Sequence, residues 1–360
     1  MTMAPWDIPG LRALLLELLR RPGPSGWEQP LRDFLTHQWR QWAPEVWQDT
    51  LGNVYARLPG HASHAPCLMV TAHMDTIGLV VSRVQDGWLW IRPIGGVDPR
   101  VLLGQQVWVW GTRERPLLGV ITMLPEALRP EARQGKPPTW EDLRIDVGLP
   151  PEDVAQWVPI GAPVTFATPP QALDEHLVTG PGLDNRASLA ALSAALALLT
   201  SRPRESAIVF VATVQEETNL GGAQVAAQTV APDVALVVDV TFGQAPGTPS
   251  ENAFPLGEGI TLGWGAHMHP EVYRHLAEIA RHHAIPYTME PLPVHSGTEA
   301  RVVQLALLGI PTGLISLPLR YMHTPVETVD VRDILAAARL LEAYGLALSS
   351  EVLKRYQPTL

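Results

Sequence analysis

The sequence has a single cysteine, Cys67, among its 360 residues. One cysteine excludes a disulfide bond within the chain, so the fold cannot depend on an oxidising compartment. The simplest expectation is a cytoplasmic protein in which Cys67 packs in the core.

Long hydrophobic runs are absent as well. The segment MTMAPWDIPGLRALLLELLRR has only a short apolar run, which Arg12 and Glu17 interrupt, and it shows neither a basic leader nor a small-residue cleavage site. Nowhere does an uncharged apolar stretch reach the roughly 18 residues that a membrane span requires. We therefore expect no secretion signal and no membrane partner.

Positive charge is scarce. The chain has 26 Lys and Arg residues against 36 Asp and Glu, which gives a formal net charge of −10. Nucleic-acid binding depends on Lys and Arg that displace counterions from phosphate, and no basic cluster offsets the deficit. We expect no nucleic-acid partner.

What the chain does contain is an α/β pattern in two separate stretches. Its length predicts two domains. Apolar strands are expected at 67–75, 207–214, 234–240 and 312–317, and they alternate with helical segments such as 187–199 and 271–283. This alternation indicates a mostly parallel sheet with helices on both faces. We assign this catalytic domain to residues 1–75 and 176–360.

The residues between these stretches, 76–175, have a different pattern. Short alternating segments at 78–84, 87–94, 105–111 and 117–124 are separated by Gly, Pro and charged turns. Such spacing is typical of strands joined by tight turns. The sequence therefore predicts an inserted all-β domain.

The predicted α/β strands end in side chains that can bind metal. The candidates are His73 and Asp75 after the first strand, Glu216 and Glu217 after the second, Asp239 in the third and His323 after the fourth, with Asp184 at the start of a buried helix. In an open α/β sheet, ligands gather outside the carboxyl ends of the strands, so these residues are expected to converge. Any one of them could instead cap a helix or close a turn, but together they favour a metal site.

The ligand types indicate which metals would bind. Imidazole and carboxylate ligands without thiolates suit catalytic zinc, cobalt or manganese. The charges of Asp184, Glu217 and Asp239 leave one net positive charge when two divalent ions bind, which can hold a hydroxide. Two ions roughly 3.5 to 4 Å apart can acidify a shared water and polarise a substrate carbonyl. We expect two divalent metal ions per chain, with zinc or cobalt favoured and manganese as an alternative.

Three carboxylates near these ligands have individual interpretations. Adjacent side chains on extended backbone point in opposite directions, so one of Glu216 and Glu217 can bind metal while the other acts as general base and acid. A solvated acidic turn is the alternative. Asp75 lies two residues after His73 on the same side of a strand, where it could orient the imidazole.

Several blocks of this sequence resemble the signatures of a known family. The blocks are AHMDTIG, GLDNRAS, QEETNLGGA, VVDVT and RYMHTPVETVDVRD, in this order. They are similar to those of the tetrahedral, deblocking or glutamyl aminopeptidases, metallopeptidase family 42, some of which were once labelled cellulase M. The resemblance covers essentially the whole chain.

The resemblance implies specific roles and an assembly. It implies that His73 and Asp239 bind one metal, that Glu217 and His323 bind the other, that Asp184 bridges them, that Glu216 is the base and that Asp75 supports His73. It implies peptide substrates that lose their N-terminal residues. It also implies that the insert is a PDZ-like or barrel dimerisation domain, and that homodimers assemble into a homododecamer.

The chain departs from the family at one block. Where the family commonly has GGTDA, this chain has HSGTEA, with His295 and Ser296 upstream and Glu299 in place of an Asp. Glu299 could pair with the α-ammonium of a substrate and alter side-chain preference. It could equally cap the helix expected at 299–308.

The leading hypothesis is a metal-dependent aminopeptidase in which a hydroxide bridging two ions attacks the first peptide bond. A two-metal carboxypeptidase or deacylase could use the same ligands, and a non-catalytic scaffold protein could keep the fold alone. The cellulase label would need two carboxylates flanking a sugar bond, and the metals explain Glu216 and Glu217 better.

Overall fold

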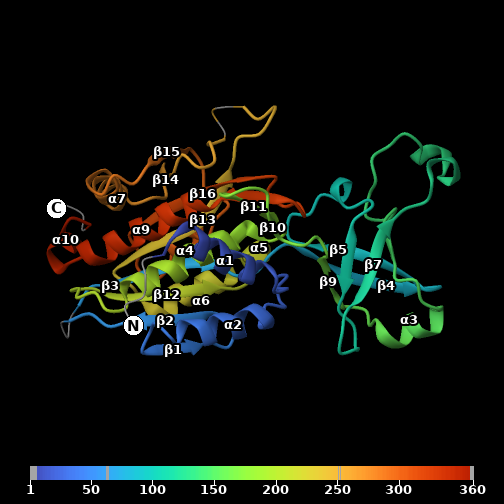
Figure 1. The fold of residues 1–360 in the computed structure, drawn as a ribbon, viewed down its shortest axis with the longest axis horizontal. Helices are drawn as coiled ribbons and strands as arrows, with labels where there is room; N and C mark the ends of the chain where they lie inside the picture. Colours follow the sequence, from blue (N-terminus) through green and yellow to red (C-terminus); the bar gives the residue numbers. More distant parts are fainter. Residues whose placement is uncertain (1–5, 62–64, 250, 252, 357–360) are drawn as a thin grey trace.

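The structure is a computed structural model that describes residues 6–61, 65–249, 251 and 253–356. Two parts lie side by side along the long axis of the molecule, an α/β part and a β-barrel (Figure 1). This arrangement confirms the predicted fold class, an α/β domain with an all-β insert.

One eleven-stranded sheet organises the α/β part. Its strands follow the order β1-β2-β12-β3-β13-β16-β17-β11-β10, and β14 and β15 pair beside β16. The bounds are β1 (Glu45–Gln48), β2 (Val54–Leu58), β3 (Cys67–His73), β10 (Gln171–Ala172), β11 (Leu177–Gly180), β12 (Ala207–Thr213), β13 (Val234–Phe242), β14 (Ile260–Gly265), β15 (Tyr287–Leu292), β16 (Thr312–Arg320) and β17 (Glu327–Asp330). At the centre β12, β3, β13 and β16 run parallel, so their carboxyl ends meet at one edge. Towards both edges the pairs β1·β2, β2·β12, β16·β17 and β10·β11 are antiparallel.

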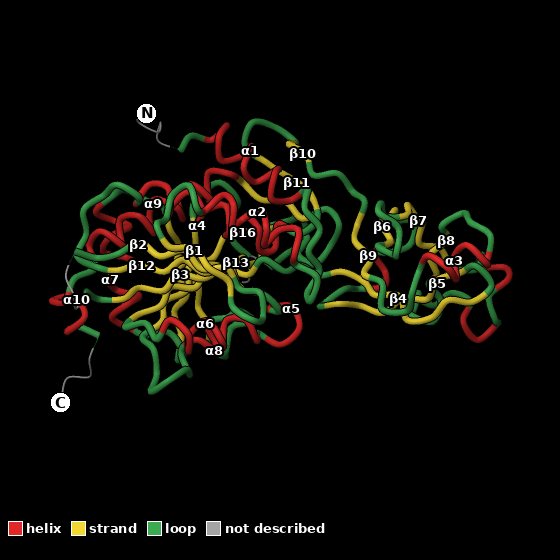
Figure 2. The backbone as a smooth tube through the Cα atoms, turned by 90° about the horizontal axis from the view of Figure 1, so that it is seen from below, coloured by secondary structure: helices red, strands yellow, loops and turns green. Residues whose placement is uncertain are grey.

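Helices cover both faces of the sheet (Figure 2). The larger core includes side chains of α1 (Ile8–Leu19), α2 (Gln29–Trp39), α4 (Leu183–Leu199), α7 (Pro270–His282) and α9 (Val331–Ala347), and α10 (Ser350–Lys354) follows α9. On the opposite face α6 (Gly221–Val230) and α8 (Ala300–Val303) contribute to a smaller core. From Ala187 on, helix α4 is almost wholly apolar because it is enclosed by the sheet, α1 and α9.

The alternation along each strand decides which face its polar side chains reach. In β3, Leu68, Val70 and Ala72 belong to the larger core, whereas Met69 belongs to the smaller one. Because successive side chains of a strand point to opposite faces, His73 lies on the same face as Met69. His73 of β3 and, by the same alternation, Asp239 of β13 therefore lie on the face that α6 and α8 cover.

The barrel has its own core. It closes in the order β4-β5-β8-β7-β6-β9, with bounds β4 (Gly78–Gln85), β5 (Trp88–Ile94), β6 (Gln106–Val109), β7 (Leu117–Thr122), β8 (Arg144–Asp146) and β9 (Pro163–Phe166). Three 3-10 turns, η1 (Pro99–Val101), η2 (Glu126–Leu128) and η3 (Glu131–Arg133), and helix α3 (Pro151–Trp157) complete it. Inward-facing residues such as Leu79, Ile91, Val107 and Ile145 are buried together.

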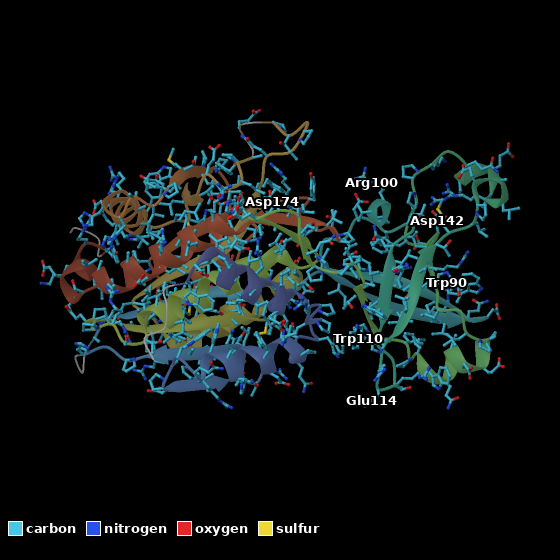
Figure 3. The ribbon with its side chains drawn as sticks, in the orientation of Figure 1. Trp90, Arg100, Trp110, Glu114, Asp142 and Asp174 are labelled. Atoms are coloured by element: carbon cyan, nitrogen blue, oxygen red, sulfur yellow. The ribbon has the colours of Figure 1, made fainter. Side chains whose placement is uncertain are left out.

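Figure 3 labels Trp90 and Trp110 on the barrel. Trp110 contacts Trp27 of the α/β part, with 4.8 Å between the ring centroids. All barrel strands lie within the predicted 76–175 insert, while β10 pairs with β11 in the large sheet. The domain boundaries themselves stay a prediction.

None of the helices in the described part of the chain has both the length and the apolar character that a bilayer span needs.

The central strand β12 provides a test of the fold. Phe210 is fully buried there, whereas Phe242 at the end of β13 is 60% exposed. Phe210→Ala should lower the free energy of unfolding by about 3 to 5 kcal/mol, because it removes buried contacts and leaves a cavity. Phe242→Ala is the matched control and should change it by no more than about 0.5 kcal/mol. Urea denaturation of the metal-free proteins measures both, and equal shifts would contradict the assigned core.

Candidate metal centre

The candidate ligands lie level with one another across the parallel centre of the sheet. His73 ends β3 and pairs with Thr213 of β12. On the other side Val237 of β13 pairs with Thr71, so Asp239, two residues further on, is level with His73. The register of the strands thus places side chains distant in sequence at one edge.

The five predicted ligands and Glu216, the predicted base, fall into two groups of three. One group is His73, Glu216 and Asp239, and the other is Asp184, Glu217 and His323; within each group the ligand atoms lie within 4.8 Å of one another. In the first, the Nε2 of His73 is 3.7 Å from the Oδ1 of Asp239 and 3.9 Å from the Oε2 of Glu216. In the second, the Nε2 of His323 is 3.4 Å from both the Oδ2 of Asp184 and the Oε2 of Glu217.

Asp184 connects the two groups. Its Oδ1 is 3.1 Å from the Nε2 of His73, and its Oδ2 is 3.4 Å from the Nε2 of His323. Asp184 and Asn185 depart from helical φ/ψ at the start of α4, and the peptide bond between them is cis. The two distances place this one carboxylate opposite both imidazoles.

The backbone around Glu216 and Glu217 differs from the expectation. They begin the short helix α5 (Glu216–Asn219), so the premise of extended backbone was wrong. Gln215 before them has a left-handed φ of 62°, which turns the chain out of β12. Successive helical residues still point roughly 100° apart, so the two carboxylates reach different groups.

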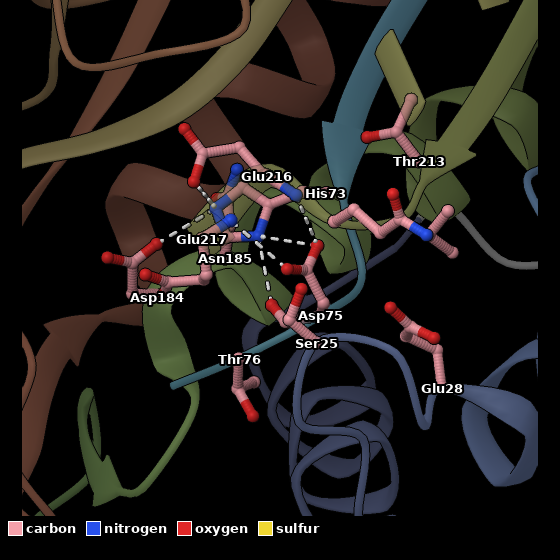
Figure 4. A network of polar contacts seen from close by, with 12 residues as sticks. Ser25, Glu28, His73, Asp75, Thr76, Asp184, Asn185, Thr213, Glu216 and Glu217 are labelled. Atoms are coloured by element: carbon pink, nitrogen blue, oxygen red, sulfur yellow. Dashed lines mark hydrogen bonds and ion pairs between the residues drawn. The ribbon is translucent and has the colours of Figure 1, made fainter. Parts of the chain in front are cut away.

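Asp75 holds the start of α5 in place (Figure 4). Its Oδ1 accepts a hydrogen bond from the backbone N–H of Glu216 at 3.0 Å, and its Oδ2 accepts one from that of Glu217 at 3.1 Å. The Nδ1 of His73 is 2.9 Å from the backbone carbonyl of Asp75 and 3.6 Å from its carboxylate. Because a carbonyl only accepts, this contact puts a proton on Nδ1, and Nε2 is the nitrogen that faces Asp184.

Glu327 fixes the backbone of Asp184 and His323 in the second group. The sequence interpretation missed this residue. Its Oε2 accepts from the backbone N–H of Asp184 at 3.0 Å, and its Oε1 accepts from that of His323 at 2.9 Å. The side chain is fully enclosed on β17. An acidic residue in an otherwise buried strand, four residues after His323, was the available signal.

Burial dominates the electrostatics of the centre. It raises the pKa of Glu216 to about 9 and that of Asp239 to about 8, and it raises the pKa of Glu217 well above the usual range. Burial acts in the same direction on Asp184, but hydrogen bonds to the imidazoles of His323 and His73 hold its pKa below the ordinary value. Crowded carboxylates of this kind favour either protons or cations between them.

The residues present fit divalent cations. Within the described residues, the buried Oε1 of Glu217 has no hydrogen-bond partner. Buried polar atoms are normally paired, so an unpaired oxygen on the carboxylate whose other oxygen is 3.4 Å from the Nε2 of His323 is suited to a metal ligand. The donor set of imidazole nitrogens and carboxylate oxygens matches zinc, cobalt or manganese.

Glu299 lies beneath the centre. It is fully buried and accepts hydrogen bonds from Thr71 of β3, at 2.9 Å, and from Thr213 of β12. It occupies the N-cap position of α8, but its side chain makes no capping hydrogen bond. Burial raises the pKa of Glu299. Contact with a substrate stays a prediction.

A cavity of about 860 Å³ opens over both groups. Its lining includes the ligands His73, Asp184, Asp239 and His323, and also Glu290, Leu292, His295, Arg301 and Met322. It is large enough for the end of a peptide.

Comparisons with known proteins agree with this geometry. A family model described as M42 glutamyl aminopeptidase matches residues 52–340. A lysyl aminopeptidase of Pyrococcus furiosus is 37% identical over 335 residues, which are 92% of this chain and 95% of that protein.

Solved structures show the same fold. The aminopeptidase APDkam598 from the archaeon Desulfurococcus kamchatkensis superposes with a TM-score of 0.91 at 32% identity, covering 98% of this chain and 99% of that one. The TET1 peptidase of Pyrococcus horikoshii, described as able to assemble into a tetrahedron or a large octahedral shell, gives a TM-score of 0.83 at 29% identity, covering 94% of this chain and all of that one. With a family model matched over most of its length and a relative of this similarity, the chain belongs to the M42 family of glutamyl aminopeptidases.

Proposed function

We propose that this protein is an aminopeptidase that uses two divalent metal ions to remove N-terminal residues from peptides. The observation that supports this most directly is the pair of imidazole–carboxylate groups joined by Asp184. Its two oxygens face one imidazole each, at 3.1 and 3.4 Å. A carboxylate in this position is suited to bridge two ions.

The proposed ligand roles divide the two groups between two ions, with Glu216 set apart as the base. His73 and Asp239 would hold one ion, Glu217 and His323 the other, and Asp184 both. Two such ions, when bound, acidify a water molecule and polarise the carbonyl of the scissile bond. Zinc or cobalt is favoured by the donor types, with manganese as an alternative.

Glu216 is the proposed general base and acid. It lines the cavity and stands in the first group, with its Oε2 3.9 Å from the Nε2 of His73. A carboxylate at the cavity wall can take a proton from the attacking water and return it to the leaving amine. Asp75 and Glu327 are positioning residues, because each fixes two backbone N–H groups next to the ligands.

Substitution at Glu216 tests whether this residue is the general base or a metal ligand. Glu216→Gln keeps the shape of the side chain but removes its proton affinity, so activity should fall about 10²- to 10⁴-fold. Metal analysis should still find about two ions per chain. Asp184→Asn is the comparison variant and should lose bound metal as well as activity. If Glu216→Gln instead lost one ion per chain, Glu216 would be a ligand and the base would lie elsewhere.

Blocking the substrate distinguishes an aminopeptidase from its two-metal rivals. A peptide with a free α-amino group should be cleaved from that end, whereas the same peptide after N-acetylation should lose nearly all turnover. Mass spectrometry of the products measures both. Cleavage of the acetylated peptide at its carboxyl end would indicate a carboxypeptidase, and release of acetate would indicate a deacylase.

We also propose that homodimers form through the barrel and assemble further into a dodecamer in the cytoplasm. Apolar side chains are exposed on neighbouring barrel strands, including Trp108 at 37%, Leu118 at 47% and Val120 at 42%. Trp108 and Leu118 are direct cross-strand neighbours. A continuous exposed apolar surface of this kind is typical of an interface.

The barrel proposal has a direct test. The double variant Leu118→Glu, Val120→Glu should shift the molar mass from light scattering towards the monomer, because charge opposes burial of that surface. Leu173→Glu, at an exposed position outside the barrel strands, is the control and should leave the assembly unchanged. An unchanged mass in the double variant would place the interface elsewhere.

A further inference from the structure

The cavity contains one carboxylate that the proposed chemistry does not use. Glu290 lies on β15 and lines the cavity together with the metal groups. Its Oε1 accepts a hydrogen bond from the hydroxyl of Thr241 at 2.7 Å, and its Oε2 accepts one from the hydroxyl of Thr261 at 2.6 Å. The two threonines therefore fix both oxygens of Glu290 in one orientation.

The strand register places the hydrogen-bond partner of this carboxylate two residues along β13 from the ligand Asp239. Thr241 follows Asp239 by two residues on β13, so both side chains lie on the same face, roughly 6.6 Å apart along the strand. Asp239 pairs with Ser316 of β16, and Ser316 pairs with Thr261 of β14. Held by Thr241 and Thr261, Glu290 therefore lies over the same face of the sheet as Asp239.

Glu290 has acceptor capacity to spare. In the part of the chain that the structure describes, its side-chain hydrogen bonds come from the two threonine hydroxyls, and no Lys, Arg or His nitrogen forms an ion pair with it. A carboxylate has about four lone-pair sites, so two remain for a ligand. Thr241 and Thr261 are buried and Glu290 is half-buried, which keeps the charge on the cavity floor.

We propose that Glu290 binds the charged end of the first side chain of the substrate, so that the enzyme prefers peptides that begin with Lys or Arg. This inference rests on the proposed aminopeptidase function. With the first peptide bond at the metal groups, an extended lysine side chain reaches roughly 6 Å from its Cα. That length is similar to the distance along β13 between Asp239 and Thr241, the residue that holds Glu290. Leu292 and Met322 in the cavity wall can cover its methylene groups.

A basic residue in the same cavity suggests the opposite preference and provides the control. Arg301 also lines the cavity, and it could pair with an acidic first side chain. Arg301 is exposed on α8, however, whereas two hydroxyls hold Glu290 on the sheet. A fixed carboxylate loses less freedom on binding and is the better anchor.

The test compares first residues whose side chains differ in charge. We would measure kcat/KM for lysyl, norleucyl and glutamyl p-nitroanilides with the metal-loaded enzyme and with Glu290→Gln. Glutamine keeps the shape and can still hydrogen-bond both threonines. The lysyl-to-norleucyl ratio should exceed one in the native enzyme and fall about 10- to 100-fold in Glu290→Gln, the range expected for loss of a charged hydrogen bond. Arg301→Gln should leave this ratio unchanged.

Two further measurements keep the outcome decisive. Calorimetric binding of L-lysinamide and L-norleucinamide reads the preference without turnover, and Glu290→Asp, whose carboxylate is one methylene shorter, should move the preference from Lys towards Arg. If all anilides are cleaved but the ratio is the same in Glu290→Gln, the specificity inference is overturned and the aminopeptidase function stands. If nothing is cleaved but lysinamide still binds through Glu290, the site is real and the proposed function fails. Equal binding of the two amides overturns the inference.

Discussion

The structure depends on the burial of several carboxylates around two imidazoles at one edge of a parallel sheet. Burial raises the pKa of Glu216, Glu217 and Asp239, which favours the protonated form of these groups when no cation is bound. A pair of divalent ions would replace those protons and convert mutual repulsion into attraction. The sheet holds this arrangement in place, because the aligned ends of β3, β12 and β13 bring the ligands together.

Ligands outside the strands need additional hydrogen bonds to fix them, because a loop alone does not fix a side chain. Gln215 and His323 both have a left-handed φ of 62°, which costs energy for residues other than glycine. Hydrogen bonds to buried carboxylates offset that cost: Asp75 accepts from the N–H groups of Glu216 and Glu217, and Glu327 accepts from those of Asp184 and His323. Asp75 and Glu327 therefore fix the positions of the loop ligands, just as the strand register fixes the positions of His73 and Asp239.

The difference between ligands on strands and ligands in loops also explains which parts of the site the sequence could predict. Apolar runs that end in His, Asp or Glu are local patterns, so the strands and the convergence of the ligands were predictable. The turn at Gln215 has no glycine or asparagine to mark it, and the extended-backbone premise failed there. The partners of Glu299 and Glu290 are distant in sequence: Thr71 is 228 positions from Glu299, and Thr241 is 49 from Glu290. Only the folded sheet shows that these carboxylates face it.

The barrel is close to the metal centre as well as being a candidate interface. The chain leaves the centre at Asp75 and enters β4 at Gly78, so little backbone separates the two. Beyond β5 the chain returns to the ligands: a Cβ on Gly95 would lie 3.1 Å from the Oε2 of Glu217, and one on Gly96 would lie 2.6 Å from the Nδ1 of His323. The second approach is too close for any side chain, so Gly96 is required for His323 to stay where it is. The segment that follows β5 of the barrel therefore packs directly on two of the ligands, and the barrel strand and the metal centre share this stretch of backbone.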